Sequence, residues 1–478
     1  MEFEVVIGLE VHCELTTKSK MFSSSAVSFG EKPNTMVNEV DLGFPGTMPV
    51  VNKKAVEYAI RVCHVLNMEI DDLLCFDRKN YYYADLPKGF QITQDKHPIG
   101  RNGYIDVEVD GLNKRIEIER LHMEEDTAKQ LHYANITLID YNRSGIPLIE
   151  IVTTPTLKSG KEAVAYLEGL KSLFLFTEVS DAKMEEGSMR CDVNVSIMEK
   201  GSNILGTKTE IKNLNSISNV QKAIDFEVHR QKEIILNGGK IEQETRRFNE
   251  STKETVLMRT KGEAADYKYY TEPNILPIQL DKSWIKLIKE QLPELPKARV
   301  ERYINEYGIP KVEANILVSS KEISDFYETV TKYSNEYKLI ANWILSEVLA
   351  YLNKSQLSFS ELKLEAKYLA DLVNYVVKAT ISSKQAKVVF EKMVESGKSP
   401  DKILDEEGMK QLSDVTQIKE FISIVFEQQP QSIEDYKNGK TRAVGFIVGQ
   451  VMKASKGQAN PTLTNQLVKE MLDELINK

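Results

Sequence analysis

The chain has 478 residues, 41% of them hydrophobic and 28% charged, and a formal net charge of −9. This length exceeds what one ordinary core accommodates, so we expect two to four domains, and the composition is typical of a soluble globular protein. It contains no run of about 18 apolar residues, as a membrane span requires, and the acidic N-terminus is unlike a signal peptide. The sequence therefore predicts a cytoplasmic protein with no membrane partner, and the negative charge taken alone argues against nucleic acid.

Short stretches with an apolar residue at every second position dominate the chain up to residue 292, which is the period of a strand with one face on a core. The first is IGLEVHCEL (7–15), where Glu10, His12 and Glu14 share the polar face. Further examples are 102–111, 114–121, 148–154, 192–197 and 207–214, and helical periodicity is found at 52–67, 160–176 and 217–239. The pattern predicts one large α+β domain, 1–292, around a mostly antiparallel sheet.

The four cysteines are not expected to carry chemistry. None of them forms a CxxC pair, so neither a zinc knuckle nor a dithiol redox site is indicated. Cys13 and Cys63 lie in apolar patterns, and we predict that they are small core residues.

A cluster of prolines marks the end of the first domain: Pro273, Pro277, Pro293 and Pro296. From about residue 297 onward the periodicity is almost wholly helical, and a second break lies near 395–408. We therefore expect an all-α helical domain, 293–405, and a small helical tail domain, 406–478.

The tail reverses the charge of the whole chain. From Tyr436 to Lys469 there is no Asp or Glu. The cations of this segment are Lys437, Lys440, Arg442, Lys453, Lys456 and Lys469. Gly445 and Gly449 stand four apart in a predicted helix, which allows another backbone to approach closely. A solvated basic face and a patch that contacts a phosphate backbone both fit this pattern.

Acidic residues gather on predicted strands and strand ends of the first domain. Besides Glu10 and His12, LHMEEDTAK (121–129) supplies a histidine and three carboxylates, and KMEEGSMRCDVNVSI (183–197) supplies further acids and an arginine. Carboxylate oxygens with one imidazole suit Mg²⁺ or Mn²⁺ better than Zn²⁺. A structural network of ion pairs is the alternative interpretation.

Glu150 stands alone in an apolar run, between Ile149 and Ile151. A strand of this composition is expected to be covered on both faces, and an unpaired buried carboxylate would cost several kcal/mol. We therefore expect Glu150 to face an arginine, a lysine or a metal ion.

Basic and polar residues are interleaved with the acids. FDRKNYYYADLPKGFQITQ (76–94) carries Lys79, Lys88 and three consecutive tyrosines, and GTKTEIKNLNS (206–216) carries Lys208 and Lys212. A metal ion with lysines and amides suits phosphoryl transfer, because preplaced cations stabilise charge that spreads over phosphate oxygens. The common nucleotide signatures are missing, since SGKS and NGKT both lack the first glycine of a P-loop.

Nine motifs, in order along the chain, closely resemble the B subunit of the bacterial and organellar tRNA-dependent aspartyl/glutamyl amidotransferase. Five of them are quoted above, and the other four are KMFSSS, DLGFPGTMPVVN, DYNRSGIPLIEIVTTP and VGQVMKASKGQANP. The resemblance runs from Val5 to about Asn460, which is nearly the whole chain.

The resemblance implies a cradle-like catalytic domain, a helical domain and a small tail that contacts the tRNA. It implies a heterotrimer with two other chains, the amidase or A subunit, which hydrolyses glutamine, and the small C subunit. The substrates would be misacylated Glu-tRNA(Gln), Asp-tRNA(Asn) or both, whose side-chain carboxylate is phosphorylated with ATP and Mg²⁺. Ammonia released from glutamine by the amidase would then displace phosphate and give the amide.

The resemblance also implies roles for individual residues. It gives His12, Glu125 and Glu150 as Mg²⁺ ligands, with Glu10 and Glu124 beside them for a second ion or for orienting the first. Glu10, His12, Glu125 and Glu150 form the expected catalytic set.

The resemblance also implies roles for cationic and aromatic residues. Lys79, Lys88, Lys208 and Lys212 are candidates for contacts with ATP phosphates or the tRNA 3′ end. The tyrosines at 81–83 are candidates for stacking on a base. The tail residues expected to contact tRNA are Lys437, Lys440, Arg442, Lys453 and Lys456.

Three other interpretations stay open. A non-catalytic tRNA-binding scaffold with a structural acid cluster would explain the basic tail but not Glu150. An unrelated hydrolase with paired carboxylates would need no ATP. The archaeal paralogue that acts on glutamyl-tRNA alone carries a large extra insertion, for which this chain has no room.

Overall fold

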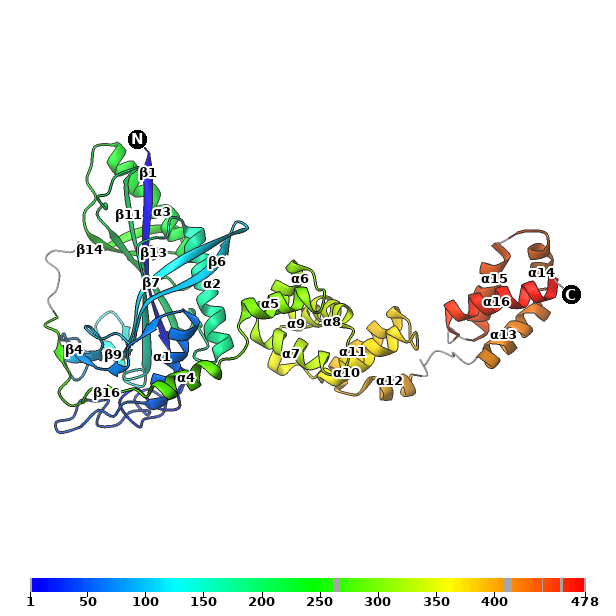
Figure 1. The fold of residues 1–478 in the computed structure, drawn as a ribbon, viewed down its shortest axis with the longest axis horizontal. Coiled ribbons are helices and arrows are strands. Elements are labelled where there is room, and N and C mark those ends of the chain that lie inside the picture. The colour runs from blue at the N-terminus through cyan, green and yellow to red at the C-terminus, as the bar shows by residue number, and fades with distance from the viewer. Residues whose placement is uncertain (1, 261–266, 408–414, 441, 456–458, 477–478) are drawn as a thin grey trace. The chain divides into compact units, whose positions relative to one another are not determined.

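The computed structural model describes residues 2–260, 267–407, 415–440, 442–455 and 459–476. The chain divides into two compact units, Met1–Pro296 and Lys297–Lys478. Figure 1 shows that the first combines strands and helices, whereas the second is helical. Among the helices that the structure describes, none is long and apolar enough to cross a membrane. The finer division at 292 and 405 stays a prediction.

A nine-stranded sheet is the framework of the first unit, in the order β14-β13-β12-β11-β1-β10-β7-β6-β2. Neighbouring strands are antiparallel except for β12 and β13, which are parallel. The strands are β1 (Phe3–Glu14), β2 (Glu69–Ile70), β6 (Gly100–Val109), β7 (Leu112–Glu125), β10 (Pro147–Thr153), β11 (Met189–Glu199), β12 (Thr209–Lys212), β13 (Glu244–Asn249) and β14 (Glu254–Thr260). The α+β class is confirmed, and the cradle shape stays a prediction.

One face of this sheet forms the core. In β1, the odd-numbered residues Ile7, Leu9, Val11 and Cys13 are fully buried, whereas the even-numbered residues from Gly8 to Glu14 are only partly buried. Cys63 is also fully buried, which confirms the core role predicted for Cys13 and Cys63. The opposite, even-numbered face is therefore left for polar side chains.

Three helices pack on the odd-numbered face and share its apolar cluster. They are α1 (Lys53–Val65), α2 (Gly160–Thr177) and α3 (Ile217–Leu236). Each begins after a capping residue, Asn52, Ser159 or Ser216, whose side chain accepts a hydrogen bond from a backbone N–H of the first turn. Such caps satisfy amides that have no partner within the helix.

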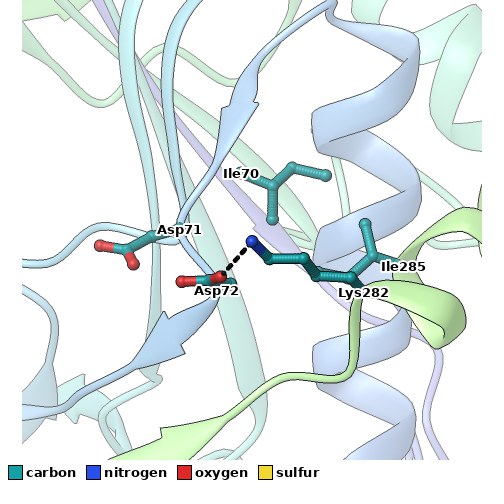
Figure 2. Close-up of a pocket in the computed structure, with 5 residues that line it drawn as sticks. All are labelled: Ile70, Asp71, Asp72, Lys282 and Ile285. Atoms are coloured by element: carbon teal, nitrogen blue, oxygen red, sulfur yellow. Dashed lines mark ion pairs between the residues drawn. The ribbon is translucent and has the colours of Figure 1, made fainter.

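Smaller sheets and a fourth helix complete the unit. The sheets pair β15 (Tyr270–Thr271), β4 (Asp77–Asn80) and β5 (Phe90–Thr93), then β16 (Ile278–Gln279) and β3 (Leu73–Leu74), and then β8 (Lys129–His132) and β9 (Thr137–Asp140). Helix α4 (Lys282–Glu290) borders a cavity of about 410 Å³, where Lys282 Nζ lies 3.3 Å from Asp72 Oδ2 (Figure 2). None of the residues that line this cavity was predicted to carry chemistry.

The second unit is built from helices, as predicted for the C-terminal part of the chain. Its first elements are α5 (Pro296–Asn305), α6 (Lys311–Val318), α7 (Lys321–Thr331), α8 (Tyr337–Trp343), the π-helix η1 (Ile344–Val348), α9 (Leu349–Ser355) and the 3₁₀-helix η2 (Phe359–Glu361). They are followed by α10 (Ala366–Val377), α11 (Ser383–Ser396), α12 (Pro400–Glu406), α13 (Val415–Gln428), α14 (Pro430–Lys437), α15 (Arg442–Ala454) and α16 (Pro461–Ile476). Ile418, Ile447 and Val468 from α13, α15 and α16 are fully buried in an apolar cluster of their own.

Candidate metal centre

Three neighbouring strands carry a row of polar side chains across the sheet. His12 of β1 faces Glu150 of β10, and Glu150 faces His122 of β7. Facing residues of antiparallel strands project to the same side, with Cβ atoms about 4.5–5.5 Å apart. Glu124 lies two positions beyond His122 and shares its face. The alternation that buries the odd-numbered residues thus gathers carboxylates and imidazoles on the other side.

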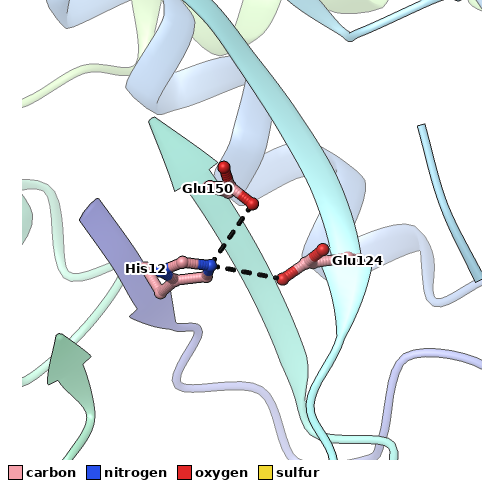
Figure 3. Close-up of side chains that lie close together, drawn as sticks. All are labelled: His12, Glu124 and Glu150. Carbon is pink, nitrogen blue, oxygen red and sulfur yellow. Dashed lines mark ion pairs between the residues drawn. The ribbon is translucent and has the colours of Figure 1, made fainter. Parts of the chain in front are cut away.

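Three of these side chains converge (Figure 3). His12 Nε2 lies 3.2 Å from Glu150 Oε2 and 3.8 Å from Glu124 Oε1. One potential ligand atom from each of the three residues lies within 4.8 Å of the other two. The His12 side chain is 22% exposed, whereas those of Glu124 and Glu150 are 5% and 14% exposed. The group is therefore largely withdrawn from water but still reachable.

The charges in this group change each other's pKa. Burial raises the pKa of Glu150, but the neighbouring His122 and His12 outweigh it and hold this pKa well below its usual value. Burial lowers the pKa of His122, and the Glu150 and Glu124 carboxylates reverse the effect and raise it to about 9. The same balance raises the pKa of His12. An imidazole must be neutral to coordinate a metal, so protonation of His12 would compete with metal binding.

The residues present fit a small divalent cation. One imidazole nitrogen and two carboxylate oxygens form a donor set that suits Mg²⁺ or Mn²⁺, ions whose remaining ligands are commonly water or substrate oxygens. The sequence predicted an arginine, a lysine or a metal ion opposite Glu150. In the part of the chain that the structure describes, the ion pairs of Glu150 are with His12 and His122.

Glu125 lies outside this group, although the resemblance implies that it is a ligand. Consecutive residues of a strand project to opposite faces, so Glu125 and Glu124 diverge. The Glu125 carboxylate instead pairs with Lys88 and accepts a hydrogen bond of 3.0 Å from the backbone N–H of Ile92. The assignment of Glu125 as a ligand stays a prediction, and the structure favours Glu124.

Glu10 lies on the same face, next to a second set of charges. Its Oε1 accepts a hydrogen bond of 3.0 Å from Asn194. Burial and then the charges of Glu150 and Asp192 raise the pKa of Glu10. Lys212 Nζ lies 2.5 Å from Asp192 Oδ2 and 3.3 Å from Glu210 Oε1. Glu10 is not a member of the converging group, so its metal role also stays a prediction.

Comparisons with known proteins assign the chain to a family. Residues 5–286 match the GatB/GatE catalytic domain, and residues 325–472 match the GatB domain. The chain is 52% identical over 474 residues to the B subunit of aspartyl/glutamyl-tRNA(Asn/Gln) amidotransferase from Macrococcus caseolyticus, and 51% identical over 474 residues to that from Staphylococcus aureus strain JH9. Both alignments cover 99% of this chain and 100% of the relative.

The chain belongs to the family of amidotransferase B subunits. Members of this family are amidotransferases, so the chain is an enzyme of the ligase class. The catalytic-domain match includes His12, Glu124 and Glu150.

The lysines predicted to contact phosphate in this amidotransferase chain lie in different surroundings. Lys88 and Lys212 are engaged by carboxylates, as described above. Lys79 Nζ lies 5.0 Å from the centre of the Tyr267 ring and 5.8 Å from that of Tyr81. Lys208 is exposed and borders, with Glu10, a cavity of about 300 Å³. Lys208 and Lys212 thus come close to the polar face, and the phosphate contacts of all four lysines stay a prediction.

The described basic residues that are predicted to bind tRNA lie on α14 and α15 or between them. Lys437, Lys440, Arg442 and Lys453 are exposed. Lys440 Nζ lies 3.0 Å from Asp435 Oδ1. Lys456 lies outside the described residues. Gly445 and Gly449 are exposed on α15, and a Cβ built on either would meet no atom within 4 Å.

The sequence reasoning did not assign a role to His122, although its segment was singled out. Its Nε2 lies 3.0 Å from Glu150 Oε2 and 3.7 Å from Glu124 Oε2. The alternation of residues along β7 could have indicated His122, because it puts His122 and Glu124 on one face of the strand and Glu125 on the other.

Proposed function

We propose that the chain binds Mg²⁺ through His12, Glu124 and Glu150 and phosphorylates, with ATP, the side-chain carboxylate of Glu-tRNA(Gln), Asp-tRNA(Asn) or both. The supporting observation is the convergence of three ligand atoms within 4.8 Å on the polar face of the sheet. The relatives are named as B subunits of an aspartyl/glutamyl-tRNA(Asn/Gln) amidotransferase, which agrees with this substrate class.

The chemistry explains why phosphorylation precedes amidation. A carboxylate is a poor acyl donor because its oxide is a poor leaving group. In the proposed sequence, a carboxylate oxygen attacks the γ-phosphorus of ATP, ADP leaves, and an acyl phosphate forms. Ammonia then attacks the acyl carbon, the bond between this carbon and the phosphate oxygen breaks, and the departing phosphate takes up the proton that the nitrogen loses. A bound Mg²⁺ would offset the repulsion between the carboxylate and ATP and would align them.

The residues of this chain have distinct parts in the proposal. His12, Glu124 and Glu150 would hold the ion, and the partial exposure of His12 and Glu150 would let substrate oxygens reach it. Lys208 and Lys212 are proposed to bind phosphate oxygens at the Glu10 end of the polar face. Lys79 and Lys88 are proposed to contact the ATP phosphates or the tRNA 3′ end. Glu10 and Glu125 are proposed to orient these cations and the substrate.

The designation of the relatives as B subunits supports an assembly of several chains. We propose a heterotrimer in which the amidase, the A subunit, supplies ammonia from glutamine, and the small C subunit is the third member. The exposed cations Lys437, Lys440, Arg442 and Lys453 are proposed to contact the tRNA backbone. The reaction is proposed to take place in the cytoplasm, where aminoacyl-tRNAs are consumed.

An amidation assay of the heterotrimer tests this function, with each misacylated tRNA and with or without ATP. His12→Ala and Glu150→Ala should retain glutamine hydrolysis and lose ATP-dependent amidation. Full amidation by either variant at saturating Mg²⁺ would contradict the assignment. It would favour the rival in which the chain is a non-catalytic scaffold for tRNA.

A further inference from the structure

His122 bridges two carboxylates that come from different strands. Its Nε2 lies 3.0 Å from Glu150 Oε2 on β10 and 3.7 Å from Glu124 Oε2 on its own strand, β7. The residue is 6% exposed, and its Nδ1 is buried without a hydrogen-bond partner among the described residues. If this side chain contributed only packing, an apolar residue would be more favourable, because an unsatisfied buried polar atom such as His122 Nδ1 costs free energy.

The same Glu150 oxygen also lies 3.2 Å from His12 Nε2. A neutral imidazole has one nitrogen that donates a proton and one that offers a lone pair. If His12 Nε2 offers its lone pair to a cation, it cannot at the same time donate a proton to Glu150. Among the described residues, His122 is then the imidazole left to donate to this oxygen.

We propose that His122 is the positioning residue of the metal centre, whose Nε2–H donates to Glu150 and holds this carboxylate and that of Glu124 in ligating orientation. The inference rests on the proposed function, because it presupposes an ion at His12, Glu124 and Glu150. It adds an outer partner that fixes the ligands, which is the usual companion of a protein metal site.

The experiment measures binding of Mn²⁺ to the full chain, from the electron paramagnetic resonance signal of the free ion. His122→Phe keeps an aromatic ring but removes the donor, whereas His122→Gln has an amide N–H that reaches the position of Nε2. We expect the phenylalanine variant to raise the dissociation constant about 10–100-fold, and the glutamine variant to stay close to the wild type. The matched control is His97→Phe, because the His97 side chain is 49% exposed and pairs with Asp71 outside this group.

The possible outcomes separate the two proposals. Wild-type affinity in His122→Phe would overturn the positioning role, and so would a glutamine variant as weak as the phenylalanine one, since the imidazole itself would then be a ligand. If His122→Phe does not fold, judged by thermal unfolding in EDTA, His122→Asn replaces it, because its shorter amide cannot reach Glu150. Mn²⁺ binding by His122→Asn equal to that of His122→Gln would then overturn the role. A wild-type chain that binds no Mn²⁺, or a His12→Ala variant that binds it normally, would instead refute the metal centre.

Discussion

His12 Nε2 lies 3.2 Å from Glu150 Oε2, and the two residues face each other across the β1–β10 pair. The contact joins segments far apart in the sequence, and it depends on the antiparallel register of the strands. Glu124 reaches the same place from the next strand, β7, so the three side chains meet because β1, β10 and β7 are adjacent.

The choice between Glu124 and Glu125 as ligand gives the first prediction. Glu124→Gln should weaken Mn²⁺ binding by more than the roughly 10–100-fold that loss of an outer partner costs. Glu125→Gln should leave Mn²⁺ binding nearly unchanged, because Glu125 pairs with Lys88. Titration of both variants with Mn²⁺ checks this, and the reverse order of the two effects would restore Glu125 as the ligand.

Lys212 should stabilise the acidic end of the polar face. Replacing it with methionine removes the cation that lies 2.5 Å from Asp192 Oδ2. The Lys212 side chain is 34% exposed, so solvent screens part of the loss, and we expect about 1–2 kcal/mol of destabilisation. Urea denaturation of the full chain measures the change. The second substitution Asp192→Asn should recover part of it, and a double variant less stable than Lys212→Met would contradict the pairing.

The exposed tail cations should contribute to tRNA affinity through release of counterions. Lys437→Ala, Arg442→Ala and Lys453→Ala together should weaken tRNA binding. They should also reduce the slope of log affinity against log salt by about 2–3, since each phosphate contact adds roughly 0.7–0.9. Filter binding at several salt concentrations measures the slope. The control is Lys419→Ala, because Lys419 is exposed on α13 outside the acid-free segment. An equal loss of tRNA affinity and of salt slope in this control would contradict a specific role for the tail cations.

The two glycines of α15 should be removable without loss of folding. Gly445 and Gly449 are exposed, and a Cβ at either position would meet no atom within 4 Å. Alanine in their place should raise stability by about 1 kcal/mol each, because glycine costs that much in a helix interior. Thermal unfolding of each variant tests this expectation. A lower midpoint would show that the positions pack against something else, and weaker tRNA binding by a more stable variant would show that the open face is used.

Much of the fold follows from local patterns. The period of two in 7–15 predicted β1 and its buried face, and the helical period in 52–67 and 160–176 predicted α1 and α2. The apolar setting of Glu150 predicted an arginine, a lysine or a metal ion opposite it, whereas the structure pairs it with two histidines. The strands and helices were predictable because their periodicity involves residues close together in the chain, whereas the histidine partners of Glu150 come from other strands.

Other features depend on pairing between distant segments, which local patterns do not contain. The parallel alignment of β12 with β13 and the order of the nine strands are examples. The preference for Glu124 over Glu125 as a metal ligand depends partly on a local pattern and partly on strand pairing. The alternation within β7 was visible in the sequence, but its phase relative to His12 became clear only when β10 was seen between the two strands.

The row across β1, β10 and β7 also makes the site sensitive to insertions and deletions. One extra residue in β7 before His122 would turn Met123 toward the polar side and Glu124 toward the opposite face, where Glu125 now pairs with Lys88. Ion capture would then fail although every ligand was still encoded, so a mutational survey limited to amino-acid replacements would miss this weakness.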